Sequence, residues 1–302
     1  MAAIKTVKAT VNGTEYTLTY NSSTGAYEAS ITAPTKSSYN QTDHVYGITV
    51  TATDIAGNST SVDSSDAAFG SSLKLRVKEK TPPVVAFTSP TSGAGLTNNK
   101  PTFTLDITDT DSGVDLSTLV IKIDNGAAIT SGYTTKAITG GYTVTYTPTT
   151  ALSDGSHTIT ASVKDNDGNT STTASITIKV DTVPPTLTIT APTDAIYTNN
   201  SSCTVTGKTN DVTSSPVTVK ITRNGTDMGS VTVGSDGSFS KTITLVSGAN
   251  TIVITSTDSL GKSTSVTRTV TLDTDVPVFT NVSVTPNPVD AGATYVISVK
   301  VG

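Results

Sequence analysis

The sequence predicts an all-β protein made of several domains in series, and three features support this fold class. Thr, Val and Ile dominate the 302 residues, and these residue types favour strands. Gly, Pro, Asn and Asp interrupt the strand-forming stretches at short intervals, as turns between strands require. The same punctuation recurs along the chain, which is the mark of a tandem repeat.

The composition argues against several classes of function. The net charge of −5 is modest, and no cluster of Lys and Arg is interleaved with aromatic residues, so we expect no nucleic-acid partner. No apolar stretch is long enough to span a bilayer, so no membrane insertion is expected. The N-terminal residues MAAIKTVKATVNG contain no apolar core of a signal peptide. The single cysteine, Cys203, alternates with Val205 on a predicted strand and is expected to be an inert core thiol.

Proline-containing joints separate the repeats. They read KEKTPPVVAFTSP (Lys78–Pro90), KVDTVPPTLTITAP (Lys179–Pro192) and LDTDVPVFTNVSV (Leu272–Val284). Each ends one strand and begins another, and proline prevents the strand ladder from continuing through the joint. The joints predict four segments, which are residues 1–81, 82–182, 183–275 and 276–302.

A β-hairpin precedes each joint. The three hairpins read ITVTATDIAGNST (Ile48–Thr60), ITASVKDNDGNTS (Ile159–Ser171) and IVITSTDSLGKST (Ile252–Thr264). The glycine in each turn supplies the positive φ that tight hairpin turns need. The alternation of apolar residues predicts the following inward-facing set: Ile48, Val50, Ala52, Leu73, Leu75, Val77, Ile159, Ala161, Val163, Ile176, Ile178, Val180, Ile252, Ile254, Val270 and Leu272.

Repeats of about 100 residues with short alternating strands describe immunoglobulin-like β-sandwiches. The proline joints and the Asp-x-x-Gly hairpins resemble the bacterial Ig-like repeats that occur in tandem on phage tail proteins and bacterial surface adhesins. The resemblance covers nearly the whole chain and implies an elongated rod of Ig-like sandwiches. Such motifs specify the fold well and the function poorly.

The first segment is expected to lack two strands. Its opening TVKATVNG (Thr6–Gly13) matches TVKITRNG (Thr218–Gly225) and LVIKIDNG (Leu119–Gly126), which lie at the third strand of the complete repeats. Residues 276–302 supply two initial strands, so one copy is predicted to complete the next by strand complementation and to form a filament. The predicted contact residues are Val7, Ala9, Val11, Tyr295, Ile297, Val299 and Val301. Trimmed ends, packing of these ends on another protein, or a self-sufficient smaller first domain remain alternatives.

No catalytic constellation is recognisable in the sequence, so the chain is predicted not to be an enzyme and to need no organic cofactor. His157 occupies the strand position that Tyr46 and Asn250 hold in the other repeats, which indicates a structural corner rather than a base. His44 lies in a polar loop without a motif that pairs it with a nucleophile.

Acidic residues provide one candidate metal site. Asp165, Asp167 and Asn169 in the turn KDNDGN, together with Asp181 at the following joint, are candidate ligands for Ca²⁺ between the second and third domains. The alternative is that these residues form solvated turns, because Asp and Asn favour turns in any case.

The resemblance implies a non-enzymatic structural protein, which is a fibre or decoration of a phage tail or virion. It would be made in the cytoplasm and would contact itself, other virion proteins, or a glycan or protein of the host surface. The alternative is a spacer of a secreted bacterial adhesin or surface filament, located outside the cell. An accessory module of a polysaccharide-degrading enzyme is a third alternative, although the chain has no Trp and only 5% aromatic residues for sugar binding.

Overall fold

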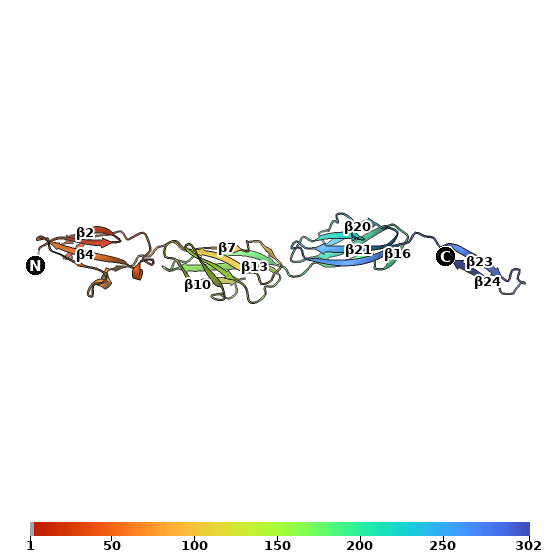
Figure 1. Ribbon diagram of the computed structural model, residues 1–302, viewed down its shortest axis with the longest axis horizontal. Coiled ribbons are helices and arrows are strands. Elements are labelled where there is room, and N and C mark those ends of the chain that lie inside the picture. Colours follow the sequence, from red (N-terminus) through yellow and green to blue (C-terminus); the bar gives the residue numbers. More distant parts are fainter. Residues whose placement is uncertain (1–2) are drawn as a thin grey trace. The chain divides into compact units, whose positions relative to one another are not determined.

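The computed structural model describes residues 3–302 and confirms the all-β fold class. The chain divides into two compact units, Met1–Val180 and Asp181–Gly302. Figure 1 shows the strand arrangement within each unit. In the part of the chain that is described, no helix is long and apolar enough to cross a membrane.

The first segment of unit 1 forms one sheet with the strand order β3-β2-β1-β4-β5, and β6 also pairs with β4. Short 3-10 helices, η1 (Thr42–His44) and η2 (Gly70–Leu73), lie in its loops. The strands are β1 (Ile4–Val11), β2 (Thr14–Asn21), β3 (Ala26–Glu28), β4 (Tyr46–Asp54), β5 (Ser59–Val62) and β6 (Lys74–Leu75). The segment that matches the third strand of the complete repeats overlaps β1, which pairs antiparallel with β4.

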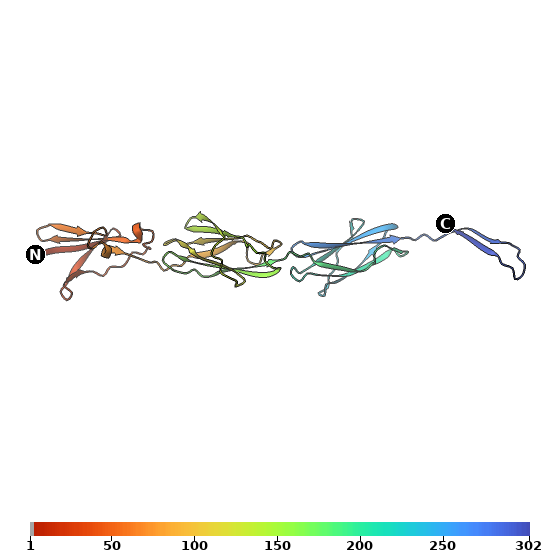
Figure 2. The ribbon, with the colours of Figure 1, turned by 90° about the horizontal axis from the view of Figure 1, so that it is seen from below.

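The second segment of unit 1 is a complete sandwich. Its sheets have the orders β10-β13-β14-β8 and β11-β12-β9-β7, and Figure 2 shows the two layers from a second direction. The strands are β7 (Val84–Ser89), β8 (Gly95–Leu96), β9 (Phe103–Thr108), β10 (Val114–Ile123), β11 (Thr134–Ile138), β12 (Gly141–Tyr146), β13 (Gly155–Asp165) and β14 (Ala174–Val180). Fully buried Phe103, Leu105 and Ile107 of β9 meet Ile159 of β13 in the core between the sheets.

Unit 2 contains a second sandwich and then a separate hairpin. The sandwich sheets have the orders β15-β17-β20 and β16-β22-β21-β18-β19, and β23 and β24 form a two-stranded sheet. The strands are β15 (Thr186–Ala191), β16 (Ile196–Thr198), β17 (Ser202–Asn210), β18 (Thr218–Arg223), β19 (Thr226–Asp227), β20 (Ser238–Thr244), β21 (Gly248–Thr257), β22 (Ser263–Leu272), β23 (Phe279–Thr285) and β24 (Val296–Val301).

The predicted inward-facing residues are buried in the two sandwiches but less so in the first segment. Ile159 and Ile252 are 0% exposed, whereas the equivalent Ile48 is only half-buried. The reason is architectural, because the described residues of the first segment form one sheet and no second sheet of theirs lies over its apolar face. Cys203 is buried as predicted, and burial raises the pKa of its thiol.

Candidate functional site

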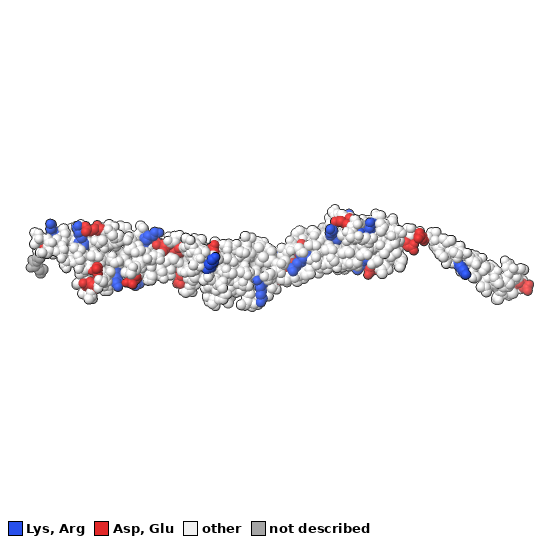
Figure 3. Space-filling view, in the orientation of Figure 1, with Lys and Arg blue, Asp and Glu red and all other residues white. Residues whose placement is uncertain are grey.

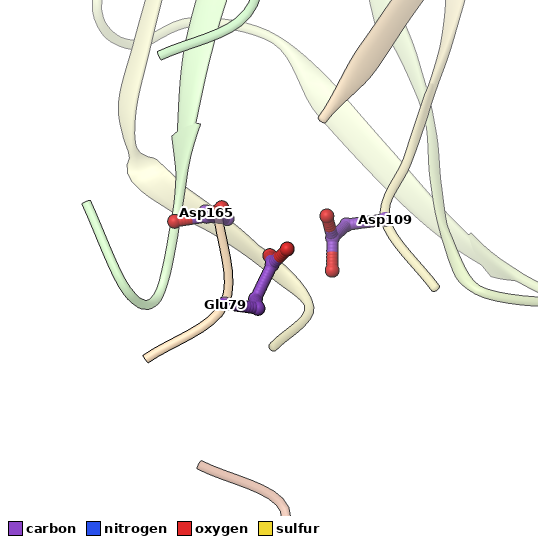
Figure 4. Close-up of side chains that lie close together, drawn as sticks. All are labelled: Glu79, Asp109 and Asp165. Atoms are coloured by element: carbon purple, nitrogen blue, oxygen red, sulfur yellow. The ribbon is translucent and has the colours of Figure 1, made fainter. Parts of the chain in front are cut away.

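Two groups of three acidic residues are the strongest candidate sites in the described part of the chain. In each group, one carboxylate oxygen per residue lies within 4.8 Å of the others. The first trio consists of Glu79, Asp109 and Asp165. The second trio consists of Asp181, Asp211 and Asp258. Figure 4 shows the side chains of the first trio pointing toward one another.

The trios occupy equivalent positions in the two repeats. One acid lies in a joint, three residues before its first proline, as Glu79 and Asp181 do. A second acid directly follows the long inner strand β9 or β17. The third lies where β13 or β21 enters its hairpin turn. The same fold therefore brings three acids together twice.

Hydrogen-bond donors surround the first trio. Asp165 Oδ1 accepts bonds from the backbone N–H groups of Asp167 (2.9 Å) and Asn169 (2.8 Å), and its Oδ2 accepts one from Asn169 Nδ2 (2.7 Å). Glu79 accepts bonds from Ser112 Oγ (3.2 Å) and from the backbone N–H of Thr81 (2.6 Å). Both oxygens of these two carboxylates are thus engaged by the protein itself.

The environment of the first trio raises the pKa of Glu79. Burial is the main cause that raises the pKa of Glu79, and a hydrogen bond with Asp165 and the negative charge of Asp109 add to it.

Around the first trio, side chains tie the first segment of unit 1 to the sandwich that follows. The carboxylate of Asp111 accepts hydrogen bonds of 3.1 Å from the backbone N–H of Ser37. Asp167 Oδ2 accepts a bond of 3.0 Å from the backbone N–H of Glu79, and Asn169 Nδ2 donates one of 3.1 Å to the Glu79 carbonyl. The joint of unit 1 is therefore held from two loops of the sandwich.

All three acids of the second trio are buried. Asp181, Asp211 and Asp258 are 1%, 8% and 5% exposed. Asp258 Oδ1 accepts bonds from the backbone N–H groups of Leu260 (2.8 Å) and Lys262 (3.0 Å). Its Oδ2 is buried and has no hydrogen-bond partner among the described residues. Neither Asp211 nor Asp258 forms an ion pair in residues 3–302.

The predicted grouping of Asp165, Asp167, Asn169 and Asp181 is corrected by these positions. Asp165 belongs to the first trio and Asp181 to the second. The reason is that β13 and β14 are antiparallel, so their turn lies a full strand length from the end of β14, at Val180. Asp167 Oδ2 and Asn169 Nδ2 bond to the Glu79 backbone, and neither residue belongs to a trio.

The sequence analysis did not predict four members of the trios, which are Glu79, Asp109, Asp211 and Asp258. They lie in segments that read as ordinary turns and joints, because Asp is common in both. A signal was present nonetheless: after the repeats are aligned on their prolines and hairpin turns, an acid stands at all three positions in both complete repeats.

His157 lies in a structural corner, as the sequence predicted. Its ring is 6% exposed; Nδ1 lies 2.5 Å from Asp124 Oδ2 and Nε2 lies 2.7 Å from the carbonyl oxygen of Ser153. Burial opposes the charged ring, but the bonds to Ser153 and Asp124 prevail and raise the pKa of His157. In the next repeat, Asn250 holds the corner by donating to the carbonyls of Val246 and Gly248.

The predicted self-association residues fall into two environments. On β1, Val7, Ala9 and Val11 are buried within unit 1. On the hairpin, Tyr295, Ile297, Val299 and Val301 are exposed, as are all other residues of β23 and β24.

Figure 3 shows acidic and basic residues interspersed on the visible face, without a large patch of one sign.

Comparison with known proteins defines the domain types. The family described as "Bacterial Ig-like domain" matches residues 88–182, and the family described as "Glucodextranase, domain B" matches residues 185–274. None of the curated proteins matches the chain in sequence.

Similar solved structures include the fibronectin(III)-like modules of Clostridium thermocellum CbhA. They are 18% identical, with a TM-score of 0.34, and the match covers 63% of this chain and 94% of that one. The immunoglobulin domains 1–5 of Sidekick-1 are also similar, at 13% identity and a TM-score of 0.39, covering 99% of this chain and 60% of that one. The chain contains β-sandwich domains in tandem, one that matches the bacterial Ig-like family and one that matches glucodextranase domain B.

Proposed function

We propose that the chain is a non-enzymatic structural spacer of a phage tail or virion, in the form of a fibre or decoration. The observation that best supports a spacer function is the hydrogen bonding at the joint of unit 1. Asp111 and Asp167, from two different loops of the sandwich, accept hydrogen bonds from backbone N–H groups of the preceding segment. Relative motion is the default between domains joined by a small interface, and we infer that these bonds reduce it at this joint.

The residues that would carry catalysis are engaged in structure instead. His157 is held on both ring nitrogens, and Cys203 is a buried thiol whose pKa is raised by burial. A nucleophile needs an accessible side chain and an adjacent base. These environments favour a structural role for both residues.

The hairpin β23–β24 provides an assembly element for this proposal. Val282 and Val284 on β23 and Val299 on β24 are exposed, and an isolated two-stranded hairpin is at best marginally stable in water. We assign a second copy of the chain as its partner, because the described sheet of the first segment contains no counterparts of β7 and β9. Those two strands pair with each other at the start of the complete sandwich. Light scattering of the full chain and of a chain ending at Asp275 tests this assignment. Assemblies that grow with concentration and vanish on truncation support it, and identical monomers overturn it.

The location is tested by immunogold labelling in the bacterium that encodes the sequence. Antibodies against the purified chain are applied to phage particles released after prophage induction and to intact uninduced cells. Label on the particles supports the virion assignment. Label on the surface of uninduced cells, with none on particles, overturns it in favour of a spacer in a surface adhesin, the second candidate that the repeat motifs resemble.

A further inference from the structure

We propose that Asp181, Asp211 and Asp258 form a calcium site, and that the equivalent first trio does not require a metal. The two trios have the same arrangement of acids in the fold. They differ in the hydrogen-bond donors that reach the carboxylate of the hairpin turn. The inference is based on this difference.

The hairpin turns of the two repeats are matched in their backbone. In both, the Asp Oδ1 accepts a bond from the backbone N–H of the residue four positions later, at 2.8 Å for Asp165 and 3.0 Å for Asp258. That later residue is Asn169 in one repeat and Lys262 in the other. The Asn169 amide also donates to Asp165 Oδ2 at 2.7 Å. Lys262 supplies no such bond, and Asp258 Oδ2 is left buried without a donor.

A buried carboxylate oxygen without a hydrogen-bond partner destabilises the fold, because the charge loses its hydration and no protein donor replaces the water. Since Oδ1 of Asp258 is engaged by amides of its own turn, Oδ2 is the oxygen that this residue contributes to the trio. A cation bound among the three acids would compensate this oxygen and relieve the repulsion between the carboxylates.

Ser214 adds a further oxygen beside the trio. Its backbone N–H donates to Asp211 Oδ1 at 2.6 Å, and its carbonyl accepts a bond of 3.1 Å from Ser259, the neighbour of Asp258. Ser214 therefore lies between the turns that carry two of the acids. Its hydroxyl is buried and also has no hydrogen-bond partner among residues 3–302.

The donor set specifies the kind of cation. Carboxylate and hydroxyl oxygens are hard ligands, and the trio contains neither His nor Cys. Ca²⁺ accepts irregular sets of oxygen ligands, whereas Mg²⁺ requires a regular octahedron and retains several of its waters. A deeply buried site built from three loops fits Ca²⁺ better than Mg²⁺.

The test is calorimetric titration of the full chain, freed of metal with chelator, with CaCl₂ and separately with MgCl₂. Saturable binding of about one Ca²⁺ per chain, with at least tenfold weaker Mg²⁺ binding, is expected from the preference of such a site. D258N removes the charge of Oδ2 and should weaken Ca²⁺ binding at least tenfold. The matched change D165N in the first trio should leave Ca²⁺ binding unaltered.

A second variant separates the proposal from general electrostatics. K262N removes a positive charge near three acids, which by charge alone would strengthen cation binding. If the Asn amide bonds to Asp258 Oδ2 as Asn169 bonds to Asp165, K262N should instead weaken Ca²⁺ binding several-fold. Circular dichroism checks the fold of each variant, and K262N alters no member of the trio.

Several results would overturn the proposal. They are an absence of saturable Ca²⁺ binding to the full chain, binding that D258N leaves unchanged, and binding that D165N weakens as much as D258N does. Tighter binding by K262N would show that Oδ2 is not the ligand.

Discussion

The side-chain amide of Asn169 donates a hydrogen bond of 2.7 Å to Asp165 Oδ2, and the same nitrogen lies 3.1 Å from the Glu79 carbonyl oxygen. One amide thus closes a hairpin turn and also binds the segment that enters the domain. Asn58 makes the equivalent bond to Asp54 Oδ2 at 2.9 Å, but there it serves the turn alone. The same turn motif has a local role in one repeat and a connecting role in the next.

Asn169→Ala is therefore expected to destabilise the chain more than Asn58→Ala does. The substitution leaves the 2% exposed Asp165 without the donor to Oδ2, and a buried acceptor that loses its partner costs about 1–3 kcal/mol. Asn58 is exposed, so water replaces its amide and the loss is smaller. Differential scanning calorimetry of the two variants measures the difference. Equal losses would contradict the connecting role of Asn169.

Removal of both carboxylates that bind the first segment should loosen the joint of unit 1. In the double variant D111A/D167A, the backbone N–H groups of Ser37 and Glu79 lose their acceptors. We expect trypsin to cleave after Lys78 several-fold faster than in the unmodified chain, because cleavage requires local opening of the segment. Asp115→Ala is the control, since among the described residues the Asp115 carboxylate accepts its hydrogen bonds from Ser117, two residues later on the same strand β10. If the double variant and the control were cleaved at the same rate, the joint would not depend on these bonds.

The His157 corner should make stability depend on pH. The pKa of His157 is raised in the folded chain, so its contribution is fully present below the unfolded value of about 6.5 and is lost as the pH rises through the folded value. The pKa of Asp124 is lowered, mainly by the bond from His157 against the opposing effect of burial. Its contribution is therefore present above the unfolded value and is lost as the pH falls through the folded value.

The measurement is calorimetry of the full chain between pH 5.5 and 8.5, in parallel with H157N. The Asn variant imitates the corner of the next repeat, where Asn250 is 0% exposed and hydrogen-bonded. We expect the melting temperature of the native chain to fall as the pH rises through the folded pKa of His157, and H157N should not show this decrease. If H157N shows the same decrease, its cause lies elsewhere than in this corner.

The alternation of apolar residues was sufficient to predict the sandwich cores, because a side-chain period of two assigns each residue to one face. Ile178 and Ile254 are buried as this pattern requires. Ile48 follows the same pattern and is half-buried, since burial also depends on a second sheet that alternation within one strand does not report.

The acidic trios were not predicted because their members come from three separate segments. Asp109, Asp165 and Glu79 meet only after β9, β13 and the joint have been placed in the fold. The hairpin turn that carries Asp165 was grouped with Asp181 at the far end of β14, whereas the structure places the two residues in different trios. Because β13 pairs antiparallel with β14, the turn between them and the C-terminal end of β14 lie at opposite ends of the hairpin. The hairpin was predicted from the sequence, so this separation could have been inferred as well.

The hairpin β23–β24 should exchange its amide hydrogens much faster than the hairpin β21–β22. Both faces of β23 and β24 are exposed, whereas Ile252 and Ile254 anchor β21 in a core. Hydrogen exchange of the full chain, measured by mass spectrometry at increasing concentration, reports this difference. At low concentration the amides of β23 and β24 should show little protection, because no described residue packs over them.

Concentration dependence then shows whether a second copy covers this hairpin. Protection of β23 and β24 should rise with concentration if the face that carries Val299 packs on another copy. Val299→Thr keeps a β-branched residue while removing apolar surface, and it should abolish the rise; Val296→Thr, on the opposite face, is the matched control. Strong protection at the lowest concentration would instead mean that the hairpin is stable without a second copy, and the assembly proposal would then lose its physical basis.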